Sequence, residues 1–493
     1  MAKPVRYLAL DLGAESGRAV SGSIARGKLT LEEIHRFPNI PVKLMDTLHW
    51  DALRLFCEMK NSLLAFRRKY GPGLAGIGVD TWGVDFGLLA EDGSLLANPV
   101  HYRDHRTDGI MEKVFEIVPR EEIYRHTGIQ FMQLNTLFQL FAMKQQNSSA
   151  LKNARTLLML PSIFLYLFSG RPVNEFTEST TSQLFDPARG TWSEFLFRKL
   201  GLPMEIMAEI VPPGTELCEL RKDICEESGL SGVRVIAPGT HDTASAIAAI
   251  PAEGKNWAYL SSGTWSLLGV ELEKPLINDA SLRHNFTNEG GIAGTFRFLK
   301  NITGLWILQE CRRAWEKQGA NLDYTKLTKM AQKSSPFACL INPDDPAFLN
   351  PADMPAEIVK FCKKTGQKAP VDRGSMARSI LESLALKYRQ TIEEMEKILG
   401  RKLETIHTVG GGIKNKLLIN FTANACNKRV VAGPVEATAS GNILLQAIST
   451  GTVASISEAR KIVGNSFDIA VVEPEKTGEW DSAYQRFRKL SES

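Results

Sequence analysis

The alternation of apolar and polar positions predicts mostly strands in the first ninety residues. Apolar and β-branched runs indicate a three-stranded meander at 5–11, 18–24 and 29–37. Apolar residues at helical spacing then predict a helix over 51–70. Two further strands are expected at 74–80, which ends in Asp80, and at 84–90. Strands that alternate with helices indicate the α/β class.

Helical patterns occupy much of the chain after these strands. Long helical stretches are expected over roughly 107–168, and a strand at 233–237 runs into a helix at 243–250. From about residue 253 the order starts again with two strands around a glycine turn. The elements expected there are strands at 257–263, 265–272 and 404–409 and helices at 303–318, 374–399 and 414–427.

The two parts of the chain open alike. Residues 8–20, LALDLGAESGRAV, and residues 258–270, AYLSSGTWSLLGV, both have the pattern of strand, small-residue turn, strand. Because 493 residues exceed one ordinary core, we expect two domains, 1–252 and 253–493, joined near 252–256. Two similar halves that face each other would leave a cleft, where two-domain proteins commonly bind small molecules.

Composition narrows the class of partner. Lys and Arg number 59 and Asp and Glu 55, a net charge of +4 without a long basic run, which predicts neither nucleic acid nor a membrane surface as partner. No stretch of about 18 uncharged apolar residues predicts a membrane span, and the N-terminus lacks a signal-peptide pattern. The seven cysteines are scattered without a CxxC pair, which favours free thiols in the cytoplasm.

Small-residue turns that follow strands are candidate phosphate sites. In LALDLGAESGR, 8–18, Asp11 stands at a strand tip, where a carboxylate can hold Mg²⁺ through water. The turn exposes backbone N–H groups, and Arg18 can neutralise phosphate charge. The turn in SSGTWSLLG, 261–269, and the three glycines of VGGGIKN, 409–415, offer similar contacts. Taken alone, each of the first two motifs is equally well explained as a plain tight turn.

The motif GVDTWGVDFGLL, 78–89, suits a sugar. Asp80 and Asp85 flank Trp82 and Gly83, and sugar hydroxyls need acceptors while sugar C–H faces stack on aromatic rings. The alternative is a hairpin whose tryptophan packs in the core.

The stretch APGTHDTASAIAAIP, 237–251, places a histidine and a carboxylate at the start of a small-residue helix. Thr240 or Asp242 could cap that helix, since short side-chain oxygens satisfy its first N–H groups. Capping leaves His241 unexplained. Because the phosphate-type turns stand in the same chain, we expect Asp242 to be a general base. It would take a proton from a substrate hydroxyl during phosphoryl transfer.

Taken together, these motifs resemble those of FGGY-type carbohydrate kinases, which share the actin and hexokinase ATPase fold. DLGAESGR, GVDTWGVDF, HYRDHRTDG, HDTASA, YLSSGTWSLLG, NEGG, LKNITGLWILQ and VGGGIKN stand in the family's order from Leu8 to about residue 465. The resemblance implies two ribonuclease H-like domains that flank a central cleft, the first with the sugar site and the second with the nucleotide site. TWGVDF with HDTASA is most similar to the rhamnulokinase branch, which implies transfer of phosphate from ATP to O1 of L-rhamnulose in L-rhamnose catabolism.

The resemblance also implies roles for individual residues, with Asp242 as base and Asp11 as magnesium ligand. With the aromatic motif included, the expected ketose contacts are Trp82, Gly83, Asp85, His241, Asp242, Thr243 and Asn301. The expected ATP contacts are Ala14, Glu15, Ser16, Gly17, Arg18, Thr264, Gln309, Gly411 and Gly412. Many of these kinases have Ser or Thr in place of Glu15, and a carboxylate beside phosphates repels them unless it points away or faces magnesium.

Three other functions are compatible with this pattern. A kinase for another ketose, such as L-fuculose or xylulose, would differ in its sugar pocket, around Trp82, Asp85 and residues 101–108. A catalytically inactive sugar- or nucleotide-binding protein would keep the fold, although Asp11, Asp242 and the glycine turns are all present. A hydrolase that uses Asp242 to activate water would turn over ATP without sugar, which closure of the cleft on the sugar normally prevents.

Overall fold

The structure is a computed structural model that describes residues 4–491, and its chain packs into two compact units. The first unit runs to Pro251 and takes in Glu271–Phe298 and Ala437–Phe467. The second unit comprises Ala252–Val270, Leu299–Glu436 and the residues from Asp468 onward. This division differs from a single cut after residue 252, because two later segments pack with the first unit.

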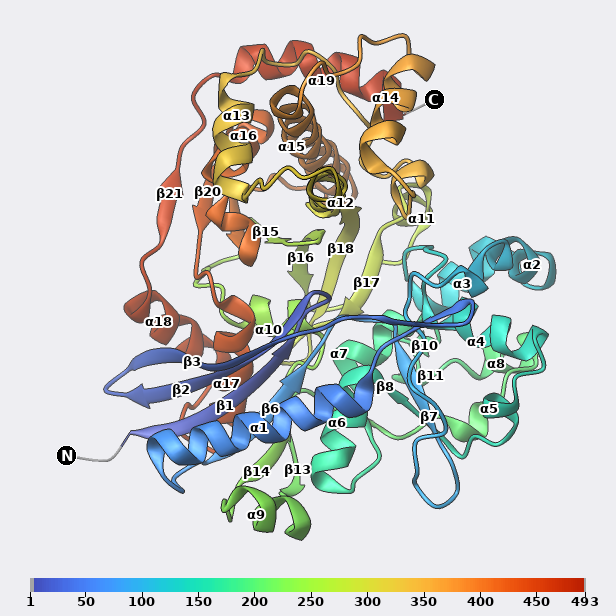
Figure 1. Cartoon of the computed structure of the whole chain (residues 1–493), viewed down its shortest axis with the longest axis vertical. Coiled ribbons are helices and arrows are strands. Elements are labelled where there is room, and N and C mark those ends of the chain that lie inside the picture. The colour runs from blue at the N-terminus through green and yellow to red at the C-terminus, as the bar shows by residue number, and fades with distance from the viewer. Residues whose placement is uncertain (1–3, 492–493) are drawn as a thin grey trace. The chain divides into compact units, whose positions relative to one another are not determined.

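The central sheet of the first unit has six strands in the order β13-β14-β6-β1-β2-β3 (Figure 1). The first three strands form the expected antiparallel meander, β6 and β14 continue the sheet in parallel with β1, and β13 is antiparallel at the edge. Their bounds are β1 Val5–Leu12, β2 Ser16–Ala25, β3 Lys28–Pro38, β6 Gly76–Asp80, β13 Thr215–Glu219 and β14 Arg234–Ala237. Helices α1 (Ala52–Tyr70) and α6 (Leu160–Ser169) cover one face, and α17 (Ala437–Ser449) covers the other (Figure 1).

Glycine alternates with apolar residues along β6, and this alternation lets α17 lie close to the sheet. A Cβ at Gly78 would stand 2.6 Å from Oδ1 of Asn442, and one at Gly76 would stand 3.1 Å from Oε1 of Gln446. Both neighbours belong to α17, whereas Ile77 and Val79 are buried with their side chains on the opposite face. The pattern that predicted a strand therefore also marks the face that a helix covers.

The same helix packs closely against α10 (Asp242–Ala248), the helix that begins with the expected base. A Cβ at Gly441 would overlap the carbonyl oxygen of Ser245, at 1.7 Å. Backbone of α17 thus passes close to the small residues of α10.

The remaining elements of the first unit surround this sheet. The stretch 107–168 is broken into short helices and one strand, a correction to the long helices expected there. Helix breaks fall at Pro119, Gly128 and Ser148, and the apolar run at 156–159 is a short buried strand, which apolar content alone does not distinguish from helix. These elements are β4 Val42–Leu44, β5 Thr47–His49, β7 Phe86–Leu89, α2 Ile110–Ile117, α3 Arg120–Thr127, α4 Thr136–Gln145, α5 Ser149–Lys152, β8 Thr156–Met159, β9 Asn174–Glu175, α7 Phe176–Ser179, β10 Phe185–Asp186, β11 Thr191–Trp192, α8 Glu194–Leu200, β12 Ile210–Val211, α9 Lys222–Ser228, α11 Asp279–Arg283, β17 Thr287–Gly290 and α18 Ile456–Ser466, with 3₁₀ turns at His105–Thr107, Thr180–Ser182 and Met204–Ile206.

A second sheet has the strand order β17-β18-β16-β15-β19-β20-β21. Its part β18-β16-β15-β19-β20 repeats the arrangement of β3-β2-β1-β6-β14, with β15 antiparallel to β16 and parallel to β19. The similarity between residues 8–20 and 258–270 is therefore a repeat of topology. The elements are β15 Trp257–Ser262, β16 Trp265–Leu272, β18 Phe296–Thr303, α12 Trp306–Lys317, α13 Tyr324–Lys333, a 3₁₀ turn Pro346–Phe348, α14 Met354–Lys364, α15 Arg373–Leu399, β19 Thr405–Val409, a 3₁₀ turn Gly411–Lys414, α16 Lys416–Cys426, β20 Arg429–Ala432, β21 Ala470–Val472 and α19 Thr477–Ser491.

Candidate active site

Two carboxylates stand at the carboxyl ends of neighbouring parallel strands in the first unit. Asp11 on β1 and Asp80 on β6 are register partners, so their side chains lie on the same face of the sheet. Arg18 faces Asp11 from β2, and its Nε and Nη2 lie 2.9 Å and 2.6 Å from Oδ2 of Asp11. The guanidinium that was expected to meet phosphate thus also orients the expected magnesium ligand.

Asp80 is fully buried beside this pair. Nδ2 of Asn442 donates to its Oδ2 over 2.5 Å, and its Oδ1 has no hydrogen-bond partner within residues 4–491. Burial and the charge on Asp11 hold the pKa of Asp80 well above its usual range. An open carboxyl oxygen next to Asp11 suits Mg²⁺, which proteins hold through one or two carboxylates together with substrate phosphates. The described part of the chain has no group of three or more His, Cys, Asp or Glu placed to form a complete metal cage.

The first expected phosphate loop is the tight turn between β1 and β2. Asn39 closes it, since its backbone N–H donates to the carbonyl oxygen of Glu15 over 3.0 Å. The side chain of Glu15 is exposed. A Cβ at Gly17 would overlap the ring of Phe37 at 2.2 Å, so this glycine is required for packing. The other loop members are half-buried: Ala14 and Ser16.

The motif 78–89 is not a hairpin. β6 ends at Asp80, whereas β7 pairs with β8 in a separate sheet. Between them, the N–H of Thr81 donates to the carbonyl of Thr240, and the N–H of Asp242 donates to the carbonyl of Thr81, over 2.9 Å and 2.8 Å. These bonds tie the Trp82–Gly83 turn to the start of α10.

Asp85 is fully buried and holds two tryptophans in place. Its Oδ2 accepts hydrogen bonds from the indole N–H groups of Trp50 and Trp82, over 2.6 Å and 2.8 Å, and Nε2 of Gln139 lies 3.4 Å from its Oδ1. Burial raises the pKa of Asp85 to about 6. The two indole rings lie 4.3 Å apart. In this geometry Asp85 orients Trp82, a different role from the direct sugar contact that the sequence suggested.

Helix α10 begins at Asp242, and neither expected cap is used. The N-cap position is His241, whose side chain makes no capping bond. Thr240 instead donates from its backbone N and Oγ1 to Oε2 of buried Glu175, over 3.1 Å and 2.7 Å. Asp242 accepts a hydrogen bond from Oγ1 of Thr243 over 3.0 Å. Burial and the charge of Asp11 raise the pKa of Asp242 to about 7, which suits a general base at neutral pH.

His241 is a neutral hydrogen-bond donor beside this base. Its Nδ1 lies 2.9 Å from Nη2 of Arg297, and a guanidinium can only donate, so the ring proton is on Nε2. Nε2 lies 3.6 Å from Oδ1 of Asp242. Burial and the charge of Arg297 hold the pKa of His241 well below its usual range. Arg297 is itself fully buried, with Nη2 3.2 Å from Oε2 of Glu289.

The sequence-based set missed a buried polar segment, NEFTESTTSQ at 174–183. Every residue of it except Phe176 is buried. Oγ1 of Thr177 accepts from the N–H of His241 over 3.2 Å, and Oγ1 of Thr181 accepts from the N–H of Val84 over 3.0 Å. A Cβ at Gly83 would stand 3.0 Å from Cγ2 of the same Thr181. The sequence does contain a signal for this segment. It is a run of hydroxyl, amide and carboxyl side chains that lacks the Lys, Arg, Gly or Pro typical of an exposed loop.

In the second unit the two glycine turns meet. A Cβ at Gly412 would stand 2.1 Å from Oγ of Ser262, and one at Gly410, whose φ is +86°, would stand 2.8 Å from the Ser262 carbonyl. At Gly411 a Cβ would meet no described atom within 4 Å. Two of the three glycines are therefore required by packing, and Gly411 alone of the three leaves open space for a ligand.

Three further expected residues belong to the second unit. Thr264 lies in the turn between β15 and β16, and its carbonyl accepts from the N–H of Trp306 at the start of α12, over 3.1 Å. Gln309, almost one turn further along α12, buries its Oε1 without a hydrogen-bond partner in residues 4–491. Asn301 is half-buried on β18.

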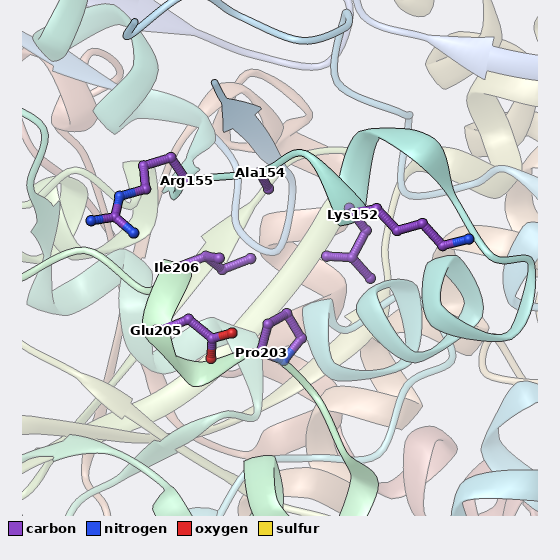
Figure 2. A pocket seen from close by; sticks show the side chains of 7 residues that line it. Lys152, Ala154, Arg155, Pro203, Glu205 and Ile206 are labelled. Carbon is purple, nitrogen blue, oxygen red and sulfur yellow. The ribbon is translucent and has the colours of Figure 1, made fainter. Parts of the chain in front are cut away.

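A pocket on another part of the first unit contains none of these residues. It has a volume of about 420 Å³ and is lined by Leu151, Lys152, Ala154, Arg155, Pro203, Glu205 and Ile206. Figure 2 shows that the side chains of Lys152 and Arg155 extend in opposite directions, so no cluster of positive charge forms in it. This pocket is no candidate for phosphate binding. In the part of the chain that the structure describes, no helix combines the length and the apolar character needed to cross a bilayer.

Comparison with known proteins shows the family of the chain. Residues 6–249 match the N-terminal domain of the FGGY family of carbohydrate kinases, and residues 258–450 match its C-terminal domain. A rhamnulokinase of Bacteroides thetaiotaomicron is 43% identical to this chain over 98% of each protein. A rhamnulokinase of Halalkalibacterium halodurans is 42% identical over 94% of this chain and 97% of its own length.

Among solved structures, the gluconate kinase from Lactobacillus acidophilus superposes with a TM-score of 0.81 at 15% identity, covering 99% of this chain and 98% of that one. At this identity the similarity concerns the fold alone. The expected two-domain α/β kinase fold, of the actin-like type, is confirmed, and so is the resemblance that the motifs carried. The chain belongs to the FGGY family of carbohydrate kinases.

Proposed function

We propose that this chain is an ATP-dependent kinase that phosphorylates L-rhamnulose at O1, giving L-rhamnulose 1-phosphate and ADP in L-rhamnose catabolism. The observation that carries the proposal is the pair at the start of α10, where Asp242, with a pKa of about 7, lies 3.6 Å from the neutral His241 ring. The choice of ketose rests on the full-length relatives, which are named rhamnulokinases.

Asp242 acts as the general base. Its carboxylate accepts the proton of the O1 hydroxyl as that oxygen attacks the terminal phosphorus of ATP, and the bond from that phosphorus to the ADP oxygen breaks. Thr243 donates to the same carboxylate and fixes its orientation. His241 donates from Nε2 to an oxygen of the ketose, because Arg297 holds its Nδ1 as an acceptor.

We assign the remaining ketose contacts to the turn after β6 and to Asn301 on β18. We assign Trp82 to stacking on the C–H face of the ketose and Gly83 to its backbone contacts. Asp85 is a positioning residue behind Trp82, given the hydrogen bond between them.

We assign the contacts with ATP and its magnesium ion to the residues that the motifs predict. Asp11 would hold Mg²⁺ through water, with Asp80 as its neighbour, and the ion would neutralise charge on the transferred phosphoryl group. The phosphate contacts from the first unit are the backbone of Ala14 to Gly17 and the side chain of Arg18. Those from the second unit are Thr264, Gln309, Gly411 and Gly412. The exposure of Glu15 supports a side chain that points away from the phosphates.

We place the activity in the cytoplasm, where ATP is available and where thiols stay reduced. All seven cysteines are free in the structure, which suits that compartment. The partners are then a small ketose and ATP, and neither nucleic acid nor a membrane is required.

The test follows ADP release from Mg-ATP with L-rhamnulose, L-fuculose, D- and L-xylulose, L-ribulose, glycerol and no sugar. We expect L-rhamnulose to give the highest kcat/KM, and the Asp242→Asn variant to lose at least about 100-fold of it. A higher kcat/KM with another ketose would change the assigned substrate, and the kinase chemistry would still hold. ADP release that no sugar stimulates would overturn the kinase proposal.

A further inference from the structure

Glu178 is a fully buried carboxyl group that nothing in the reaction above uses. It lies on α7, and neither Oε1 nor Oε2 has a hydrogen-bond partner within residues 4–491. Buried polar atoms in proteins are nearly always paired, and a carboxyl with two unpaired oxygens lowers stability. Glu175, three residues earlier, is equally buried but accepts from Thr177 and Thr240. The contrast marks Glu178 as a carboxyl group without a hydrogen-bond partner in the part of the chain that the structure describes.

The segment that contains Glu178 is hydrogen-bonded to the turns that contain the proposed site residues. Before it, Thr177 accepts from the N–H of His241. After it, Thr181 accepts from the N–H of Val84, next to Gly83, and Thr180 accepts from the N–H of Gly290, next to Glu289. Glu178 thus lies between residues that hydrogen-bond to the turn at Gly83, to the start of α10 and to β17, the strand that carries Glu289.

The electrostatic surroundings define what Glu178 could bind. The charges of Glu175, Asp242, Asp85 and Glu289 all act on it and, with burial, hold its pKa well above its usual range. The raised pKa favours the carboxylic acid form, which has one O–H donor and acceptor capacity in its oxygens. The same negative surroundings disfavour an anion such as a phosphate or a sugar carboxylate. A neutral hydroxyl group, which both donates and accepts, is the complementary partner.

We propose that Glu178 is a ketose-binding residue, whose carboxyl group exchanges hydrogen bonds with a hydroxyl of the sugar and so contributes to the choice among ketoses. The inference rests on the proposed function, since it takes the sugar of that reaction as ligand. It adds a specificity contact from α7 to those from the Trp82 turn and from α10. It also predicts that neutral ketoses are preferred over sugar acids.

The test compares Glu178→Met, Glu178→Gln and the wild type, with Ser182→Ala as control. Met has a similar length without polar atoms, whereas Gln keeps a neutral donor and acceptor. Ser182 is a buried hydroxyl of the same segment that donates to the carbonyl of Ser179 and has no role in the reaction. The readouts are the Kd of L-rhamnulose by calorimetry without ATP, the KM of ATP, the ratio of kcat/KM for L-rhamnulose and its C4 epimer L-fuculose, and Tm.

For Glu178→Met we expect a Kd at least tenfold weaker, a reduced preference between the two epimers, an unchanged KM for ATP and a Tm no lower than that of the wild type. Glu178→Gln should recover Kd to within about threefold, and Ser182→Ala should keep the wild-type Kd. A Met variant with the wild-type Kd overturns the role of Glu178 while leaving the kinase intact. A wild type that binds no ketose overturns the proposed function, and the role of Glu178 with it.

A second measurement does not depend on the folding of the Met variant. Infrared difference spectra of the wild type, taken with and without L-rhamnulose, should show a shift in the carbonyl stretch of a protonated carboxyl, and this shift should vanish in Glu178→Gln. A difference spectrum of Glu178→Gln identical to that of the wild type, or no shift in the wild type, contradicts the contact.

Discussion

The Nδ1 atom of His241 accepts a hydrogen bond from Nη2 of Arg297, 56 positions later in the chain, over 2.9 Å. This contact decides the chemistry of the histidine. It fixes the tautomer with the proton on Nε2, which faces Asp242, and burial together with the charge of Arg297 lowers the pKa of the ring. Arg297 is therefore a positioning residue, because it acts on the reaction through His241.

Replacing Arg297 by Met should lower kcat/KM for the ketose by about 100-fold, the size of effect expected when a binding group loses its orientation. The KM for ATP should stay unchanged. The variant should also lose about 3–5 kcal/mol of stability, because Glu289 keeps a buried charge without its partner. Steady-state kinetics and chemical denaturation measure the two effects.

The double variant Arg297→Met/Glu289→Met separates the two effects. It should regain most of the stability, because no charge is left unpaired, but not the activity. A double variant with wild-type kcat/KM would contradict the role assigned to Arg297. The proton position itself is measurable from the ¹⁵N shifts of the His241 ring, which should indicate Nε2–H in the wild type.

The raised pKa of Asp242 predicts the pH dependence of the rate. The base must be ionised, so kcat/KM should rise about tenfold per pH unit below pH 7 and level off above it. A profile that stays flat from pH 5 to pH 8 would contradict the assignment.

The same shift predicts the pH dependence of stability. The pKa of Asp242 is about 7 in the folded protein and 3.8 ordinarily, so between these values the unfolded chain loses its proton first, and stability falls as pH rises. Asp242→Asn removes this effect. Its Tm should exceed that of the wild type at pH 8, and the difference should shrink toward pH 4.

Replacing Asp85 by Leu should release Trp82. The two indole N–H groups would lose their acceptor in a buried place, which should cost about 2 kcal/mol or more. The KM for the ketose should rise about tenfold as Trp82 loses its orientation, without a change in the KM for ATP. Asp85→Asn keeps an acceptor oxygen and should show smaller effects. Wild-type ketose KM in Asp85→Leu would show that Trp82 does not depend on this contact.

Gly411 and Gly412 are neighbours with different expected sensitivities. Gly412→Ala should destabilise the protein by about 1–3 kcal/mol, because its Cβ would stand 2.1 Å from Oγ of Ser262. Gly411→Ala meets no described atom and should keep the wild-type Tm, yet raise the KM for ATP if the nucleotide approaches that backbone. A Gly411→Ala variant with unchanged ATP kinetics would remove this residue from the nucleotide site.

The strands of the two opening hairpins and several of the helices could be predicted from local pattern. β1 to β3, α1 and α15 lie within two residues of the expected ranges, because each has a clear apolar period. The stretch 107–168 could not be resolved, since short helices and a buried strand have similar apolar content there.

The candidate site could be predicted only as far as its residues stand in motifs. Asp11 lies near the end of a strand, and Trp82, His241 and Asp242 come shortly after strands, so these positions are visible in sequence. Arg297 and Asn442 enter from distant segments, and nothing near them in the chain indicates that they face His241 and Asp80. Only the structure excludes Thr240 as the cap of α10. Its hydroxyl donates to Glu175, which is 65 positions away in the chain.

The central claim is that Asp242 transfers the proton that makes O1 of L-rhamnulose a nucleophile. The direct measurement incubates the wild type and Asp242→Asn with Mg-ATP and L-rhamnulose labelled with ¹³C at C1, and follows the product by ³¹P and ¹³C NMR. The account predicts a phosphate ester whose phosphorus couples to the labelled C1 with the wild type, and at least about 100-fold slower formation with Asp242→Asn. An ester at another carbon, or a variant as fast as the wild type, would contradict it.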